Sequence, residues 1–302
     1  METTTSDRET KLEEFLSTKY KHQLNELSLL FPQAKSLNVD YQALDEYSPE
    51  IADELLEKPH EIIEVAERAV ENMSILSSQG EMVTPHVRFY NLPEPSRIMI
   101  RDITASKINK FISLEGVINK IITVKPKITN AVFKCNSCER VYTIEQNAYD
   151  ANLRTPGECV CGKRFFSLLT EDSDFTDIQK AEIQEPLELM RGGEQSKTIT
   201  VWLRSDLTNK LVAGDKIEIT GTVLLNMGKK KSSIYDLFID VNHVTKLEQE
   251  FEELQITEED EEWIKQFSKD PKLFQKIIAS VAPSIFGHEQ IKEAITLQLF
   301  HR

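Results

Sequence analysis

The four cysteines of this chain all lie within one short segment, as two close pairs. Cys135 and Cys138 have two residues between them, and Cys159 and Cys161 have one. Paired thiolates at such short spacing, with each pair on a tight turn, are typical of a tetrahedral zinc site. Gly162 follows the second pair and suits such a turn. We therefore expect these four cysteines to bind one zinc ion; a redox dithiol and unrelated buried cysteines are the alternatives.

A zinc ion with four protein ligands has no open coordination position, so we expect its role to be structural. It would hold a segment of roughly 30 residues, which is too short to build a core of its own. The single residue between Cys159 and Cys161 departs from the two that zinc ribbons usually have. A redox role for Cys135 and Cys138 is disfavoured because no thioredoxin-like βαβ pattern surrounds them.

Three adjacent lysines, Lys229, Lys230 and Lys231, lie between two strand-like runs and follow Gly228, which fits a turn. Neighbouring lysines repel each other, so an anionic partner such as a phosphate backbone would explain them on a chain of net charge -14. The alternative is a solvated loop that only improves solubility. The three lysines alone favour the solvated loop; the strand-like runs on either side and the family resemblance given below favour instead a basic hairpin that contacts DNA.

A second, looser basic set surrounds Pro126 and consists of Lys120, Lys125 and Lys127. These lysines are also candidates for DNA contact, with an ordinary solvated surface as the alternative. The net charge alone argues against nucleic-acid binding, but the charge is unevenly distributed, because residues 248–262 contain nine acidic residues and no basic one. We expect that acidic stretch to be a linker.

The elements that must position these residues change type along the chain. Residues 1–80 have apolar residues at helical spacing, with Ser48-Pro49 and Pro59 as helix starts. Residues 86–93, 111–124, 198–203, 216–223 and 235–244 have the alternation or β-branched content of strands, and Gly116 marks a bulge or a bend. Such strands predict a small barrel or sandwich that contains the cysteine segment as an insertion.

The end of the chain returns to helical spacing, and an apolar helical pattern is still running at Arg302. We therefore expect the natural protein to continue beyond this residue. The sequence has neither a signal-like start nor a run of about 18 apolar residues, which predicts an intracellular, cytoplasmic protein without a membrane partner.

Several stretches, in order, resemble the minichromosome maintenance (MCM) replicative helicases of the archaeal type. Asp177–Pro186 is the most specific of them. The others are His86–Pro93, Ile100–Ile103, Leu114–Lys120, Val124–Pro126, Gly192–Leu203, Asp206–Leu207, Ala213–Gly221, Ala282–His288 and Ile291–Phe300. The first 80 residues match only in being helical.

The resemblance implies an α+β chain of several subdomains. These are a helical bundle, an OB-fold β-barrel with an inserted zinc-binding module, and the start of an AAA+ motor. The expected bounds are 1–84 for the bundle, 85–132 and 169–247 for the barrel, 133–168 for the zinc module, 248–262 for the linker and 263–302 for the motor entry.

The resemblance also implies a function: DNA binding and ring assembly within a hexameric, ATP-dependent helicase. The hairpin Leu224–Ile234 would project into the ring channel. The expected partners are single- and double-stranded DNA of any sequence, further copies of the chain in a hexamer or double hexamer, and replication-fork proteins near the nucleoid. A loop that relays between the amino-terminal ring and the motor would include Arg191, Gly192, Gly193, Glu194, Gln195 and Lys197.

The chain contains no G-x-x-x-x-G-K-[ST] motif and suggests no nucleophile–base set. We therefore expect no catalytic residue here, and ATP with magnesium only in the motor that would follow. The rival hypothesis is a stand-alone zinc-ribbon and OB adaptor of transcription or translation that binds proteins through its acidic surface. Tyr142, Phe165 and Phe166 are expected to pack within the zinc module rather than to stack on bases.

Overall fold

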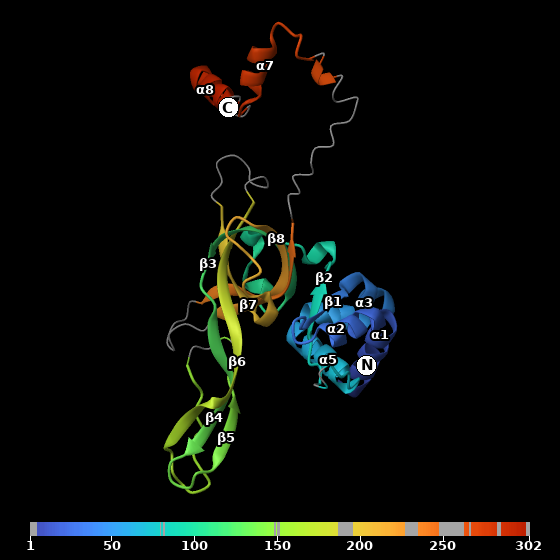
Figure 1. Cartoon of the computed structure of the whole chain (residues 1–302), viewed down its shortest axis with the longest axis vertical. Helices are drawn as coiled ribbons and strands as arrows, with labels where there is room; N and C mark the ends of the chain where they lie inside the picture. The colour runs from blue at the N-terminus through green and yellow to red at the C-terminus, as the bar shows by residue number, and fades with distance from the viewer. Residues whose placement is uncertain are drawn as a thin grey trace. The chain divides into compact units, whose positions relative to one another are not determined.

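A computed structural model describes residues 5–78, 80, 82–147, 149, 152–186, 196–226, 235–247, 263–265, 267–282 and 285–299. The chain divides into two compact units, Met1–Glu248 and Gln249–Arg302. The first unit contains a helical subdomain, a β-barrel and a module that carries the cysteines (Figure 1). The second unit contains short helices.

The helical subdomain is built from α1 (Thr5–Lys19), α2 (Lys21–Leu30), α3 (Tyr41–Tyr47), α4 (Pro49–Glu57) and α5 (Pro59–Asn72). α4 and α5 begin at prolines, as predicted, because the first turn of a helix needs no N–H donor there. Serine is a common cap in front of a helix, but the Ser48 side chain makes no capping hydrogen bond to α4. The apolar residues of α5 at helical spacing are buried in the core of this subdomain.

One strand interrupts the stretch that was predicted to be wholly helical. β1 (Ser36–Asp40) buries Leu37 and Val39 at alternate positions and pairs in parallel with β2 (His86–Tyr90). A strand of five residues carries little periodicity, and its partner lies about 50 residues away in the sequence, so a local pattern does not reveal it.

The barrel consists of β3 (Phe111–Ile121), β6 (Phe166–Gln184), β7 (Thr198–Arg204), β8 (Lys216–Asn226) and β9 (Asp236–Lys246). β3 pairs with β8, β8 with β9, β9 with β7, β7 with β6, and β6 again with β3, so the circuit is closed. Only the β7–β9 pairing of this circuit is parallel. Five strands in this closed order form a barrel of the OB-fold type.

The cysteine module is inserted between the barrel strand β3 and the part of β6 that belongs to the barrel. β4 (Lys125–Cys135) pairs with β5 (Val141–Glu145) on one side and with β6 on the other. β6 is 19 residues long, so its first part belongs to the module and its last part to the barrel (Figure 1). The sequence pattern does not reveal β4, β5 or β6: β5 has only five residues, and polar or charged residues interrupt the alternation in β4 and β6. Short 3-10 helices complete the unit at Glu94–Ser96, Ile100–Asp102, Ala105–Lys107 and Ser205–Leu207.

The second unit contains α7 (Leu273–Ser280) and α8 (Glu289–Leu299), in agreement with the predicted return to helical spacing. Several of its large apolar side chains are exposed, including Trp263, Phe274 and Phe286. Among the described residues, no helix has both the length and the apolar character needed to cross a bilayer.

Gly116 marks the point where β3 begins to pair with β6 and so closes the barrel. It pairs with Ile217 of β8, and the next residue, Val117, also pairs with Gln184 of β6. A Cβ atom on Gly116 would lie 2.1 Å from Ile183 Cγ2 and 3.0 Å from the Gln184 carbonyl oxygen. The register shift of β3 lies further on, between Ile118 and Lys120, so this glycine serves a close approach rather than a bulge.

Replacing Gly116 with alanine should therefore lower the free energy of unfolding by roughly 1–3 kcal/mol, the usual cost of overpacking a tight core. Urea denaturation followed by circular dichroism measures this change. Gly157→Ala is the matched control, because a Cβ atom there meets nothing within 4 Å. Equal stability of the two variants would contradict the proposed role of Gly116 in barrel closure.

Candidate metal centre and nucleic-acid interface

The first cysteine pair lies on a tight turn at the end of β4. The Cys135 N–H donates to the Arg140 carbonyl oxygen at 2.9 Å, and the Glu139 N–H donates to the Cys135 carbonyl oxygen at 2.9 Å. Glu139 has a φ of 60°, the left-handed conformation that this turn requires. The turn brings the Cys135 and Cys138 thiols to the same side.

The second pair lies on a similar turn. The Cys159 N–H donates to the Lys163 carbonyl oxygen at 2.8 Å, and the Gly162 N–H donates to the Cys159 carbonyl oxygen at 2.8 Å. Gly162 has a φ of 75°, which confirms the turn predicted from its position after the cysteines. The single residue between Cys159 and Cys161 is compatible with this geometry.

The two turns place all four sulfur atoms within 4.8 Å of one another. The Cys135 and Cys161 sulfurs are 3.7 Å apart, and the Cys138 and Cys159 sulfurs are 3.4 Å apart. Four thiolates at about 2.3 Å from a tetrahedral zinc ion would lie about 3.8 Å from each other. The spacing and the all-sulfur donor set therefore fit zinc. Within the described residues, no other group of cysteine, histidine or acidic side chains is arranged to hold a metal ion.

The thiols influence each other strongly. The backbone N–H of Cys161 and the Tyr142 hydroxyl stabilise the Cys159 thiolate and lower its pKa to about 6. The neighbouring Cys159 raises the pKa of Cys161 to about 12. Four thiols this close cannot all ionise next to one another, so a fully ionised set needs a cation at its centre.

The aromatic residues near the cysteines have different roles. Tyr142 and Phe166 pack edge to face with ring centroids 5.7 Å apart, and the Tyr142 oxygen lies 3.2 Å from the Cys159 sulfur. These two residues pack within the module, as predicted. The same prediction is wrong for Phe165, whose side chain is 72% exposed. The Phe165 main chain instead joins the two turns, since its carbonyl oxygen accepts the Asn136 N–H at 3.1 Å.

Tyr149, which no sequence motif indicated, attaches the module to the barrel. Its hydroxyl donates to Asp240 Oδ2 at 2.6 Å, and the Arg204 guanidinium lies 4.4 Å from its ring centre. Its ring also lies beside Trp202 and Phe238. Burial, followed by the nearby Asp240 carboxylate, raises the Tyr149 pKa, so this hydroxyl stays protonated and keeps donating. A lone tyrosine in a loop gives no sequence signal of this kind.

The predicted basic residues around Pro126 lie on β3 and β4. Lys120 and Lys125 are exposed, whereas Lys127 is half-buried with its Nζ atom 5.8 Å from the Trp202 ring centre. Lys120 lies opposite Glu182 of β6, and Lys125 lies opposite Ile178 of the same strand. Lys120 and Lys125 therefore lie beside β6, which pairs with β7 on its other side.

The outer face of β6 and β7 carries Lys180, which no sequence motif indicated, and Lys197, which was predicted only as part of the relay loop. Lys180 of β6 lies over the Trp202 ring at 4.2 Å, and Lys197 precedes β7 and is exposed. Both line an open groove of about 670 Å³, together with Asn226 and Tyr235 at the ends of β8 and β9. Within the described residues, no ion pair involves Lys120, Lys125, Lys180 or Lys197. Alternation along β6 and β7 could have indicated that Lys180 faces outward, had β6 been identified.

Two predicted sets lie outside the described residues. They are Lys229, Lys230 and Lys231 of the basic hairpin and Arg191, Gly192, Gly193, Glu194 and Gln195 of the relay loop. The structure does describe both flanks of the relay loop. The Glu185 N–H donates to the Lys197 carbonyl oxygen at 3.2 Å, and the buried Glu185 carboxylate accepts the Arg101 N–H at 2.7 Å.

The fold and the cysteine site together define an OB-type barrel that carries a helical subdomain and a candidate four-cysteine metal module. Three family descriptions match it: the MCM N-terminal domain over residues 9–91, the MCM OB domain over residues 99–227 and the MCM P-loop domain over residues 260–302. The chain belongs to the MCM family, and most of it corresponds to the amino-terminal part.

Individual relatives agree with this assignment. The minichromosome maintenance protein MCM of Saccharolobus solfataricus is 30% identical over 307 residues, which cover 95% of this chain and 44% of that protein. The DNA replication licensing factor MCM2 of Arabidopsis thaliana is 31% identical, over 88% of this chain and 29% of that protein. The chain thus spans less than half the length of these relatives. A crystal structure of the N-terminal domain of an archaeal MCM has a TM-score of 0.66 at 25% identity, and the match covers 80% of this chain and 99% of that one.

The geometry of the cysteine site predicts one zinc ion per chain. Elemental analysis of protein purified without chelators should give a zinc-to-chain ratio near one, and Cys138→Ser should lower it sharply. The module should also lose protease resistance when a chelator removes the metal, because the short turns have little core of their own. Ser137→Ala is the matched control, since it leaves all four sulfurs in place. A zinc content near zero in the unmodified protein would overturn the assignment.

Proposed function

We propose that this chain is the DNA-gripping and ring-assembling amino-terminal region of a hexameric, ATP-dependent replicative DNA helicase that acts inside the cell. Family membership supports the helicase assignment, since the relatives are named for minichromosome maintenance and replication licensing. The chain lacks a phosphate-binding G-x-x-x-x-G-K-[ST] motif, so ATP and magnesium would bind in the motor rather than here. Zinc would hold the cysteine module in shape.

The observation that carries the proposal is the basic outer face of the barrel. In OB-folds, the second and third strands and the loop between the fourth and fifth strands form the usual nucleic-acid surface. In the closed order of this barrel, these elements are β6, β7 and the segment 227–234, which contains Lys229, Lys230 and Lys231. Lys180 and Lys197 line the groove on this face together with Glu182 and Asp236, and Lys120 lies opposite Glu182 on the neighbouring strand. A strand of DNA could contact these three lysines.

The chemistry of this face favours contact with phosphates rather than bases. Lysine is a flexible point charge, suited to a phosphate and poorly suited to bidentate recognition of a base edge. Trp202 is only 6% exposed and is covered by Lys180, so it offers no open ring for stacking. Binding would therefore be nearly independent of sequence, as a helicase that travels along DNA requires.

The relay loop would carry signals between this region and the motor. Its base is held by Glu185, which is 4% exposed and bonded to Arg101, and by the Glu185–Lys197 backbone hydrogen bond. These contacts would couple a displacement of the loop to the barrel. Lys197 would thus serve both the DNA face and the loop. The subdomain bounds predicted above remain our proposed division of the chain.

Contact with DNA can be tested with two triple variants. Changing Lys229, Lys230 and Lys231 to alanine, or Lys120, Lys180 and Lys197 to alanine, should weaken binding of single-stranded DNA at low salt. The plot of log affinity against log salt should flatten by roughly 0.7 for each phosphate that the variant no longer neutralises. Fluorescence anisotropy over a salt series measures both quantities.

The matched control changes Lys11, Lys19 and Lys58 to alanine. These lysines pair with glutamates on the helical subdomain, so the control alters the net charge by the same amount away from the barrel. If all three variants lose affinity equally, long-range charge rather than this face determines binding. Unchanged affinity in both barrel variants would reject the DNA-gripping role, with circular dichroism confirming that each variant is folded.

Ring assembly is a separate prediction that rests on the family. Sedimentation of the chain at micromolar concentration should show assemblies larger than a monomer, with hexamers or double hexamers favoured by DNA. We expect weak assembly in the absence of a motor. A monomer in every condition would count against ring assembly, and would also favour the rival zinc-ribbon adaptor, for which DNA would have no effect on mass.

A further inference from the structure

The edge of β2 that faces the barrel is bonded by side chains instead of a strand. The Asn242 side chain of β9 accepts the Phe89 N–H at 2.6 Å and donates to the Val87 carbonyl oxygen at 3.0 Å. The Thr220 hydroxyl of β8 donates to the Phe89 carbonyl oxygen at 2.6 Å. The barrel therefore satisfies three successive backbone groups of the helical subdomain, in the way that a neighbouring strand would.

Asn242 can do this because it lies in a β-bulge. Thr220 pairs with His243 and Gly221 pairs with Val241, so Asn242 has no partner in the β8–β9 ladder. A bulge leaves the extra residue free of the ladder and redirects its side chain. On the opposite strand, β8, Gly221 allows the backbone of β9 to approach closely, since a Cβ atom on Gly221 would lie 2.4 Å from the Asp240 carbonyl oxygen. The barrel is thus shaped locally around the residue that bonds β2.

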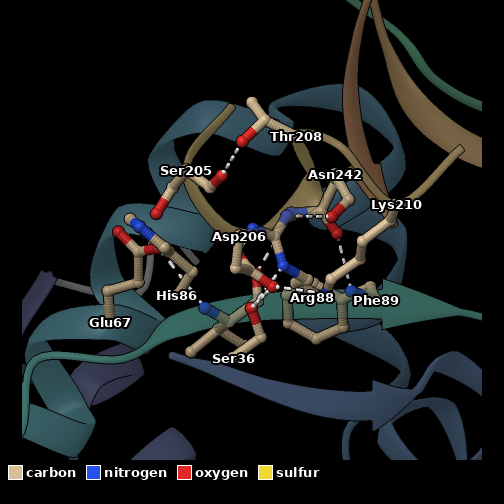
Figure 2. Close-up of polar contacts among 11 residues, drawn as sticks. Ser36, Glu67, His86, Arg88, Phe89, Ser205, Asp206, Thr208, Lys210 and Asn242 are labelled. Carbon is tan, nitrogen blue, oxygen red and sulfur yellow. Dashed lines mark hydrogen bonds and ion pairs between the residues drawn. The ribbon is translucent and has the colours of Figure 1, made fainter. Parts of the chain in front are cut away.

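Arg88 of β2 completes the contact (Figure 2). Its side chain is 7% exposed and donates to Ser36 Oγ and to the Asn242 carbonyl oxygen, both at 2.5 Å. It also forms an ion pair with Asp206, which follows β7 and accepts a hydrogen bond from Ser36 Oγ at 2.7 Å. Burial raises the Asp206 pKa, but Arg88 and then Ser36 outweigh it and hold this pKa at about 2, so the pair stays charged.

This polar contact lies between two separate hydrophobic cores. The core of the helical subdomain includes one barrel-strand residue, Phe111, and the barrel core contains no residue of α1–α5, β1 or β2 among those described. A recess of about 610 Å³ reaches Arg88, Asp206 and Ser36, so water has access to the contact. Phe111 and the ring contact between Tyr90 and His243, with centroids 5.4 Å apart, supply the apolar part of docking. The other contacts named here are polar, and water can replace their partners once the contact opens.

We propose that Asn242 and Arg88 are positioning residues that form a polar clasp, and that this clasp sets whether the helical subdomain is docked on the barrel. The bonds hold or open together, because breaking one leaves a buried charge or a buried backbone group without a partner. β9, which carries Asn242, begins just after the segment 227–234, and Asp206 follows β7. The clasp thus fixes the helical subdomain to the two strands that follow the predicted DNA hairpin and relay loop.

Hydrogen exchange on the full, zinc-loaded chain tests the clasp directly. Asn242→Ala removes the acceptor of the Phe89 N–H, and exchange of amides in β2 should accelerate by roughly tenfold or more. Arg88→Met should accelerate the same amides, while those of β6 and β7 in the barrel stay unchanged. Asn242→Asp keeps an acceptor for Phe89 but loses the donor to Val87, so it should restore part of the protection at Phe89.

Arg97→Met is the matched control, because it removes an arginine that is 45% exposed and pairs with Glu218 only at 3.9 Å. It should leave β2 exchange unchanged. Unchanged β2 exchange in both clasp variants, or equal acceleration in β2 and in the barrel strands, would overturn the proposal. Should a variant fail to fold, native-state exchange of the unmodified chain in low urea serves instead. The helical subdomain should then open as one unit with a lower opening free energy than the barrel. A single opening shared by the subdomain and the barrel would contradict the clasp.

Discussion

The pairing of β3 with β6 is the constraint on which the rest of the first unit depends. It converts a row of strands into a closed barrel, and it does so where Gly116 lets Ile183 approach without a side chain between them. Closure gives each of the five barrel strands a neighbour on both sides, and among the described strands of the sheet β5 remains at an edge. It also fixes the direction of β6, whose first part leaves the barrel as a strand of the cysteine module. The position of the candidate metal site therefore depends on the course of β6 through the barrel wall.

The cysteine module and the barrel stabilise each other by different means. Inside the module, two turns and four thiols replace a hydrophobic core. Where the module meets the barrel, Tyr149 provides one aromatic contact with Trp202 and Phe238 and one hydrogen bond to Asp240. The candidate metal site is thus linked to the barrel both by Tyr149 and by the continuous strand β6, which pairs with β4.

The charge distribution is compatible with the proposed contact with DNA, although the chain is acidic. Much of the negative charge lies in the stretch 248–262 and on the helical subdomain, where glutamates pair with lysines and arginines. Lys120, Lys180 and Lys197 on the barrel have no such partners among the described residues. Because salt screens charges over about 10 Å, the local balance matters more for a phosphate than the net charge does.

The sequence by itself determined the chemistry and the order of the parts. Two close cysteine pairs predict a metal site because thiolate spacing is local, and Pro49 and Pro59 mark helix starts because proline restricts its own backbone. Tertiary structure alone decided what depends on distant pairing: β1 with β2, the length of β6, Lys180 beside Trp202, and Asn242 in its bulge against β2. The physical reason is that a strand or a bulge gains its stabilising contacts from residues far away in the chain. A local pattern of side chains therefore does not predict these contacts.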